Sequence, residues 1–135
     1  MIRGLKLVQN AEGKWVKAGS VGNTGTKPKQ VQKKAGEMNL TEKRYECILK
    51  EKKLSGQIKD YKYEAIKLKL DQGVTFTPDF LVIFNDNSIE YHEVKNAFIR
   101  EDAKLKFKWC VQAYPFFAFK MMQYQKESKS FIKIM

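Results

Sequence analysis

Cysteine and histidine are scarce in this sequence of 135 residues, and their scarcity excludes several kinds of site. The chain has two well-separated cysteines, Cys47 and Cys110, and one histidine, His92. Zinc fingers and disulfide scaffolds need clusters of these residues at fixed spacings, so neither is expected. Both cysteines are predicted to be free thiols in a reducing compartment, and the expected location is the cytoplasm.

Long hydrophobic runs are also missing. No stretch approaches the roughly 18 uninterrupted apolar residues of a membrane-spanning helix, and the first residues lack the apolar segment of a signal peptide. The composition, 43% hydrophobic and 30% charged, is nevertheless that of a folded globular domain. We therefore expect no membrane partner and no leader.

Acidic residues are outnumbered by basic ones. The chain has 26 lysines and arginines against 15 acids, which gives a net charge of +11. Such an excess favours a polyanionic partner, and nucleic acid is the first candidate. The alternative is a generally lysine-rich composition without a binding role.

The first 37 residues differ from the rest of the chain. They hold eight basic and two acidic residues, and 19–29 are mostly Gly, Ser, Thr, Pro and Lys. After a short predicted strand over 2–8, this composition predicts a flexible basic arm over 1–37, followed by a folded domain over 38–135. The arm's lysines are candidates for DNA phosphate contacts, and an inert linker is the alternative: Lys27, Lys29, Lys33 and Lys34.

Periodicity predicts the elements of the folded domain. A helix should begin near Asn39, where Asn39 and Glu42 have capping-box spacing, and end near Gly56. Strands are predicted over 63–70, 74–84 and 89–95, a helix over 101–113, and strands over 116–119 and 131–134. This α-β-β-β-α-β order predicts an α/β fold with a central mixed sheet flanked by helices.

Two carboxylates and a lysine are predicted to converge on this sheet. Glu93 and Lys95 lie two residues apart on one strand and therefore share a face. A short turn joins their strand to the one that carries Asp79, so Asp79 is expected beside Glu93. Two adjacent carboxylates repel each other unless a cation lies between them, and a hard ion such as Mg²⁺ suits oxygen ligands. An ion there, next to Lys95, would activate water for hydrolysis.

The spacing alone has low specificity, because E-x-K occurs four times, beginning at Glu12, Glu51, Glu93 and Glu127. Only Glu93 falls in a predicted strand that directly follows a Pro-Asp strand. An ordinary exposed turn acid is the alternative interpretation of Asp79, which follows Pro78.

The segments Thr77-Pro78-Asp79-Phe80 and Glu93-Val94-Lys95 resemble the PD-(D/E)XK nuclease superfamily. The segments 38–45, 63–68 and 100–104 are further similar to small phage nucleases of this superfamily, akin to the endonuclease I type of Holliday-junction resolvase. The resemblance covers about residues 38–120, and Asn96 departs from the glycine that many relatives have after the lysine. It implies a restriction-endonuclease-like core, a DNA substrate, a homodimer and, for a phage protein, the cytoplasm of the host cell.

The resemblance also implies a role for each matching residue. Asp79 and Glu93 would hold Mg²⁺, or Mn²⁺ in its place, with the backbone carbonyl of Val94, and Lys95 would orient water and stabilise charge on the phosphate. Glu42 would be an extra acid for a second metal. Glu42 closing the capping box is the alternative, and Glu64 is a rival for the same role.

The remaining candidates are weaker. On the second helix Lys104, Lys106 and Lys108 are candidates for phosphate contacts, or else form a solvated face. His92 is predicted to face away from Glu93, and the aromatic run 114–119 is predicted to be core. The sequence thus predicts a Mg²⁺-dependent DNA endonuclease that selects branched DNA. The alternatives are a nucleic-acid-binding module with weak or no cleavage, and an interaction protein that inhibits a host factor.

Overall fold

The structure, a computed structural model, describes residues 7–9, 13, 15–17 and 36–135. The chain divides into two compact units, Met1–Gln32 and Lys33–Met135. In the first unit β1 (Leu7–Gln9) and β2 (Trp15–Lys17) pair in antiparallel fashion. Most of the strand predicted over 2–8 lies outside the described residues, as do the four lysines predicted to contact DNA from the arm: Lys27, Lys29, Lys33 and Lys34.

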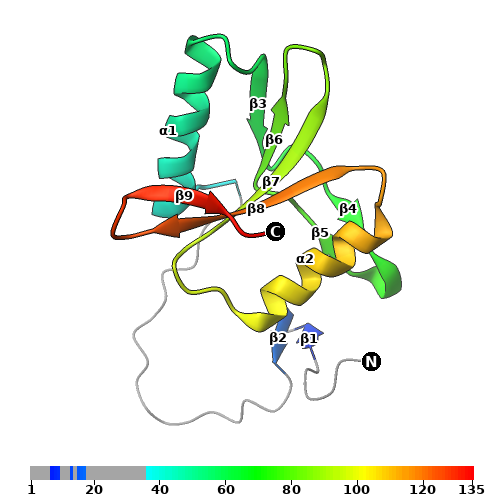
Figure 1. Cartoon of the computed structure of the whole chain (residues 1–135). Helices are drawn as coiled ribbons and strands as arrows, with labels where there is room; N and C mark the ends of the chain where they lie inside the picture. The colour runs from blue at the N-terminus through cyan, green and yellow to red at the C-terminus, as the bar shows by residue number, and fades with distance from the viewer. Residues whose placement is uncertain (1–6, 10–12, 14, 18–35) are drawn as a thin grey trace. The chain divides into compact units, whose positions relative to one another are not determined.

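The second unit contains an open mixed sheet (Figure 1). Its helices are α1 (Leu40–Leu54) and α2 (Glu101–Ala113), with a short 3-10 helix, η1, at Asp71–Gly73. Its strands are β3 (Asp60–Tyr63), β4 (Leu68–Lys69), β5 (Thr75–Phe76), β6 (Phe80–Ile83), β7 (Ile89–Lys95), β8 (Ala118–Gln125) and β9 (Ser130–Lys133). The five-stranded sheet has the order β3-β6-β7-β8-β9, whereas β4 and β5 form a separate hairpin. The predicted α/β class with a mixed central sheet is confirmed.

The connection from β7 to β8 differs from the other connections in the main sheet. These two strands are parallel, while the other neighbours in the sheet are antiparallel. A parallel pair needs a long crossover, and α2 provides it. Strands β6 and β7, by contrast, are joined by a tight turn in which Asn87 has a φ of 68°.

The two helices cover opposite faces of the sheet (Figure 1). Leu49 of α1 packs in one core cluster with Val94 of β7. Phe107 of α2 packs in the other cluster with Met121 of β8. Because Glu93 is the register partner of Met121, it faces the side of α2, and Lys95, two residues further along β7, faces the same side.

The local signals for both helices are confirmed. Asn39 Oδ1 accepts a bond from Glu42 N at 2.8 Å, and Glu42 Oε2 accepts one from Asn39 N at 3.0 Å, which completes the capping box. Helix α1 ends at Leu54, and Gly56 follows with a φ of +79°. Helix α2 has the predicted bounds, as does β7. Neither helix is long and apolar enough to cross a membrane.

The strand predicted over 63–70 is wrong. The chain is in strand conformation over Asp60–Tyr63 and again over Leu68–Lys69. Glu64 lies between them with a φ of 46°, a left-handed conformation that a strand cannot continue through. The alternating pattern still marked burial correctly, since Leu68 and Leu70 are both buried. They pack in the core cluster that contains Phe107 of α2, although their segment is not part of the main sheet.

The continuous strand predicted over 74–84 is also wrong. Thr75–Phe76 pairs with β4, whereas Phe80–Ile83 pairs with β3 and β7. Pro78 lies in the break between them, where its missing N–H prevents a continuous ladder. This break brings Asp79 to the start of β6.

The last two strands are longer or shifted relative to the prediction. Strand β8 begins at Ala118 rather than at 116 and continues to Gln125, and β9 occupies Ser130–Lys133. Phe116 is 76% exposed, so the aromatic run is not entirely core. Both cysteines are free thiols, Cys47 exposed and Cys110 buried.

Candidate active site

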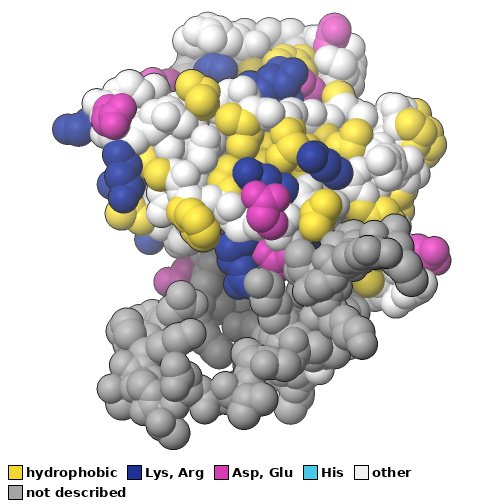
Figure 2. Space-filling model, turned by 60° about the horizontal axis from the view of Figure 1, so that its bottom comes forward, with side chains coloured by type: hydrophobic (Ala, Val, Ile, Leu, Met, Phe, Trp, Pro, Cys, Tyr) yellow, Lys and Arg dark blue, Asp and Glu magenta, His cyan; other side chains and the backbone are white. Residues whose placement is uncertain are grey.

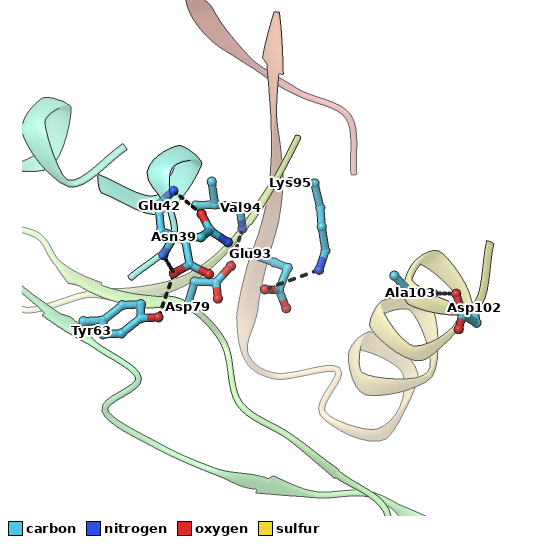
Figure 3. Close-up of polar contacts among 9 residues, drawn as sticks. All are labelled: Asn39, Glu42, Tyr63, Asp79, Glu93, Val94, Lys95, Asp102 and Ala103. Carbon is cyan, nitrogen blue, oxygen red and sulfur yellow. Dashed lines mark hydrogen bonds and ion pairs between the residues drawn. The ribbon is translucent and has the colours of Figure 1, made fainter. Parts of the chain in front are cut away.

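Asp79 and Glu93 are neighbours across the β6–β7 hairpin, as predicted. Phe80 pairs with His92 in antiparallel register, so the next positions along, Asp79 and Glu93, lie opposite each other. Val94 N–H donates to Asp79 Oδ2 at 2.7 Å (Figure 3). On the other side, the Asp79 carbonyl accepts from Glu64 N–H at 2.8 Å. Strand β7 therefore fixes the orientation of the Asp79 carboxylate directly.

Both carboxylates are withdrawn from water. Asp79 is 8% exposed and Glu93 is 5% exposed. Burial raises the pKa of Asp79 well above its ordinary range; the charge of Glu93 and a hydrogen bond with its side chain raise it further. The Val94 N–H acts in the opposite direction, and the charge of Glu42 adds to the increase. Two buried like charges that close are the arrangement that a divalent cation would stabilise.

Lys95 lies beside this pair. Its Nζ is 3.9 Å from Glu93 Oε1, and its side chain is 31% exposed (Figure 3). The ammonium group thus lies at the border between the buried carboxylates and solvent. From there it can donate to water or to an oxyanion that approaches Asp79.

Glu42 lies on the other side of Asp79, where hydrogen bonds within the fold hold its carboxylate (Figure 3). Besides closing the capping box, its Oε2 accepts a hydrogen bond from Tyr63 Oη at 2.7 Å. Glu42 is 5% exposed, and its charge reaches Asp79. Its capping role is confirmed, whereas its role as a ligand of a second metal stays a prediction.

A groove runs past these residues. It has a volume of about 490 Å³, and its walls come from the start of α1 on one side and the segment from Lys95 to α2 on the other. Asp79, Val94 and Lys95 line it between these walls. A more open hollow of about 630 Å³ lies at the turn end of β6 and β7, away from the paired carboxylates.

The oxygen donors suit a hard cation, but few side chains are available to bind one. Within 7–9, 13, 15–17 and 36–135, no three His, Cys, Asp or Glu side chains form a group that could hold a metal ion. A cation here would rely on Asp79 and Glu93, with the Val94 carbonyl predicted as a third oxygen, and on water for its other ligands.

The three lysines predicted on α2 have different surroundings. Lys106 is half-buried; burial lowers its pKa, and the charges of Glu93 and Lys95 act on it. Lys104 Nζ is instead 3.5 Å from Glu101 Oε1, and Lys108 is exposed. Figure 2 shows a face on which basic side chains lie among exposed hydrophobic ones. Of the three, Lys106 is the one that interacts with the charge of Glu93.

His92 faces away from Glu93, as predicted. It is buried on the α1 side, where its Nδ1 is 2.6 Å from Tyr45 Oη in a hydrogen bond. Its Nε2 is 3.8 Å from Glu90 Oε1 and has no hydrogen-bond partner within the described residues. Burial lowers the pKa of His92 to about 4, so it is a neutral part of the core. Glu64, the rival of Glu42, lies next to Tyr63, and its charge acts on the Tyr63 hydroxyl.

The sequence analysis missed three residues around the site. Tyr63, which holds Glu42, was expected at the start of a strand that does not exist in that form. Phe98 and Arg100 line the groove. The sequence could have indicated Phe98 and Arg100 by their position, because they follow the E-x-K strand in the loop that leads from the carboxylates to α2.

Comparison with known proteins adds no family assignment: the chain matches no protein-family model and no curated protein.

Proposed function

We propose that this protein is a Mg²⁺-dependent endodeoxyribonuclease on a PD-(D/E)XK nuclease core, with Mn²⁺ able to replace Mg²⁺. The observation that supports this proposal is the buried pair of Asp79 and Glu93 with Lys95 at its solvent border. A net charge of +11 is consistent with a DNA substrate. The resemblance of the motifs suggests branched DNA as substrate and a homodimer as the active form.

Each residue has a defined part in phosphodiester hydrolysis, in which water adds across a phosphorus–oxygen bond to give a phosphate monoester and a hydroxyl group. A bound divalent ion would supply Lewis-acid stabilisation of the charge that develops on the phosphate. Asp79 and Glu93 would hold that ion, and the Val94 N–H keeps Asp79 oriented. Lys95 donates to a phosphate oxygen or orients the attacking water, because its ammonium lies next to Glu93.

The test is cleavage of duplex, single-stranded and four-way-junction DNA, with Mg²⁺ and with a chelator. Wild-type protein should cleave in Mg²⁺, and junction DNA should be the preferred substrate. Asp79→Ala should abolish cleavage while DNA binding persists or tightens, because a carboxylate that repels phosphate is removed. Asp71→Ala is the matched control, since Asp71 is an exposed aspartate on η1.

Two outcomes would contradict the proposal. Unchanged cleavage by Asp79→Ala would exclude the carboxylate pair as the reactive centre. Tight DNA binding by the wild type without cleavage under any metal condition would favour the alternative, a nucleic-acid-binding module on the same fold.

A further inference from the structure

Phe98 is the most exposed large hydrophobic side chain of the described residues. It is 83% exposed and lies on the wall of the groove that contains Asp79 and Lys95. Leu40, which is 63% exposed, lines the same groove from the N-terminus of α1. Within the groove Asp79 is thus flanked by apolar surface that remains exposed in the fold.

The backbone around Phe98 is fixed on both sides. Gln123 Nε2 of β8 donates to the Ala97 carbonyl at 2.8 Å. On the other side, Ile99 is 9% exposed and packs in the core cluster that contains Phe107. The backbone that carries Phe98 is therefore anchored on both sides, and its exposed side chain lies on the wall of the groove. An anchored backbone loses little conformational freedom when a ligand binds the side chain.

The charges in the same wall indicate what kind of ligand suits Phe98. Lys95 and Arg100 line the groove with it; Arg100 Nη2 pairs with Asp102 Oδ2 at 3.0 Å, and the Arg100 side chain is still 63% exposed to an approaching ligand. A ligand that matches two cations and an exposed ring carries anionic groups and a flat, weakly polar face. A nucleotide unit has both, because its phosphate meets the cations while its base can stack on the ring.

This match restricts the form of the DNA. Within a duplex both faces of a base are already covered by its neighbours, so a protein ring meets a base face only where the base is unpaired or unstacked. Resting on the nuclease function proposed above, we propose that Phe98 stacks on an unpaired nucleobase beside a phosphate that contacts Lys95. The substrate class is then DNA with an unpaired nucleotide at the cleavage point, either single-stranded or at the opening of a branch.

Binding in chelator tests this inference without any cleavage. The probe is a fluorescently labelled single-stranded DNA of mixed sequence, and the measurement is anisotropy with the full chain. Phe98→Ala should weaken binding about tenfold, since stacking contributes on the order of 1.4 kcal/mol per base, which is one factor of ten. Phe98→Tyr keeps the ring and should bind within about twofold of wild type. Phe116→Ala, at a residue 76% exposed outside the groove lining, is the control and should not change affinity.

Two further probes identify the base as the partner of Phe98. On an oligonucleotide whose sites are all abasic, and on an intact duplex, Phe98→Ala and wild type should bind equally well. Equal affinity of these two proteins for ordinary single-stranded DNA, or the same loss on the abasic probe, would overturn the inference. Cleavage by wild type in Mg²⁺ is scored separately. Its absence would refute the proposed nuclease function, and a loss of binding by Phe98→Ala confined to single-stranded DNA that carries bases would still support stacking.

Discussion

Replacing Asp79 with asparagine should separate two effects of its buried carboxylate, the repulsion with Glu93 and the binding of metal. Asparagine has nearly the same shape and keeps an oxygen that can accept the hydrogen bond from Val94 N–H, which is 2.7 Å long in the wild type. It removes the negative charge, however, and with it the repulsion by Glu93. We therefore expect Asp79→Asn to raise the stability of the metal-free protein at neutral pH and to lose the stabilisation by metal.

The sign of the pH dependence follows from the raised pKa of Asp79. A group that resists ionisation in the folded state contributes stability below its ordinary pKa, which is about 3.9 for aspartate, and loses it as pH rises through the folded pKa. In chelator, wild type should therefore be less stable than Asp79→Asn at neutral pH. The difference should shrink as pH falls toward about 4.

The magnitude of metal stabilisation follows from linkage. At ten times the dissociation constant, a ligand that binds only the folded state stabilises it by about 1.4 kcal/mol. For a domain of about 100 residues that amount raises Tm by about 6–11 °C. Wild type and the exposed-site control Asp71→Asn should both show this shift as Mg²⁺ or Mn²⁺ is titrated. Asp79→Asn should not, because one of the two buried carboxylates proposed to bind the ion is gone.

Thermal melts by circular dichroism, with and without metal, measure both effects. A metal-induced shift of the same size in Asp79→Asn would show that the ion binds elsewhere. No shift in wild type at any metal concentration would refute the idea that the carboxylate pair is a cation site. A less stable metal-free variant at neutral pH would refute the electrostatic argument on its own.

Two further predictions concern the basic residues. Lys95→Arg should bind metal and DNA nearly as well as wild type but reduce the single-turnover cleavage rate by about 10²–10³, because the planar guanidinium misplaces a donor that in the wild type lies 3.9 Å from Glu93. Lys67→Arg, at an exposed lysine, is the control. If Lys95→Arg retains more than about half of the wild-type rate, Lys95 only anchors the phosphate. Changing Lys27, Lys29, Lys33 and Lys34 together to glutamine should lower DNA affinity. The slope of log affinity against log salt concentration should become shallower by about 0.7 per lost contact to single-stranded phosphate, as measured by anisotropy from low to high salt. An identical slope would exclude the arm from DNA binding.

Local signals were sufficient to predict both helices and the central hairpin. The capping box of Asn39 and Glu42 fixes where α1 begins, and Pro115 explains why α2 ends at Ala113. The alternation and short turn around 85–88 gave β7 its bounds and set Asp79 opposite Glu93. These features depend on residues close together in the sequence, which is why sequence patterns alone could find them.

The errors arose where long-range contacts override an alternating pattern. The pattern over 63–70 is broken at Glu64, whose N–H bonds the Asp79 carbonyl, a contact with a residue on another strand. Leu68 is buried because a separate hairpin packs against α2, and alternation cannot reveal which surface buries a side chain. The exposure of Phe98 was equally invisible, since an aromatic residue near a helix start is normally assigned to the core.

The capping contacts of Glu42 also bear on how many metals the site can hold. Drawing Glu42 Oε2 toward an ion would remove the acceptor of Asn39 N–H, one of the two bonds of the capping box, whereas the bond from Glu42 N–H to Asn39 Oδ1 does not depend on that carboxylate. It would also remove the acceptor of the bond from Tyr63 Oη. Glu42 already acts on the site from its capping position, because its charge helps to raise the pKa of Asp79. The hydrogen bonds of Glu42 in the structure are those of a capping residue, and its role as a ligand of a second metal stays a prediction.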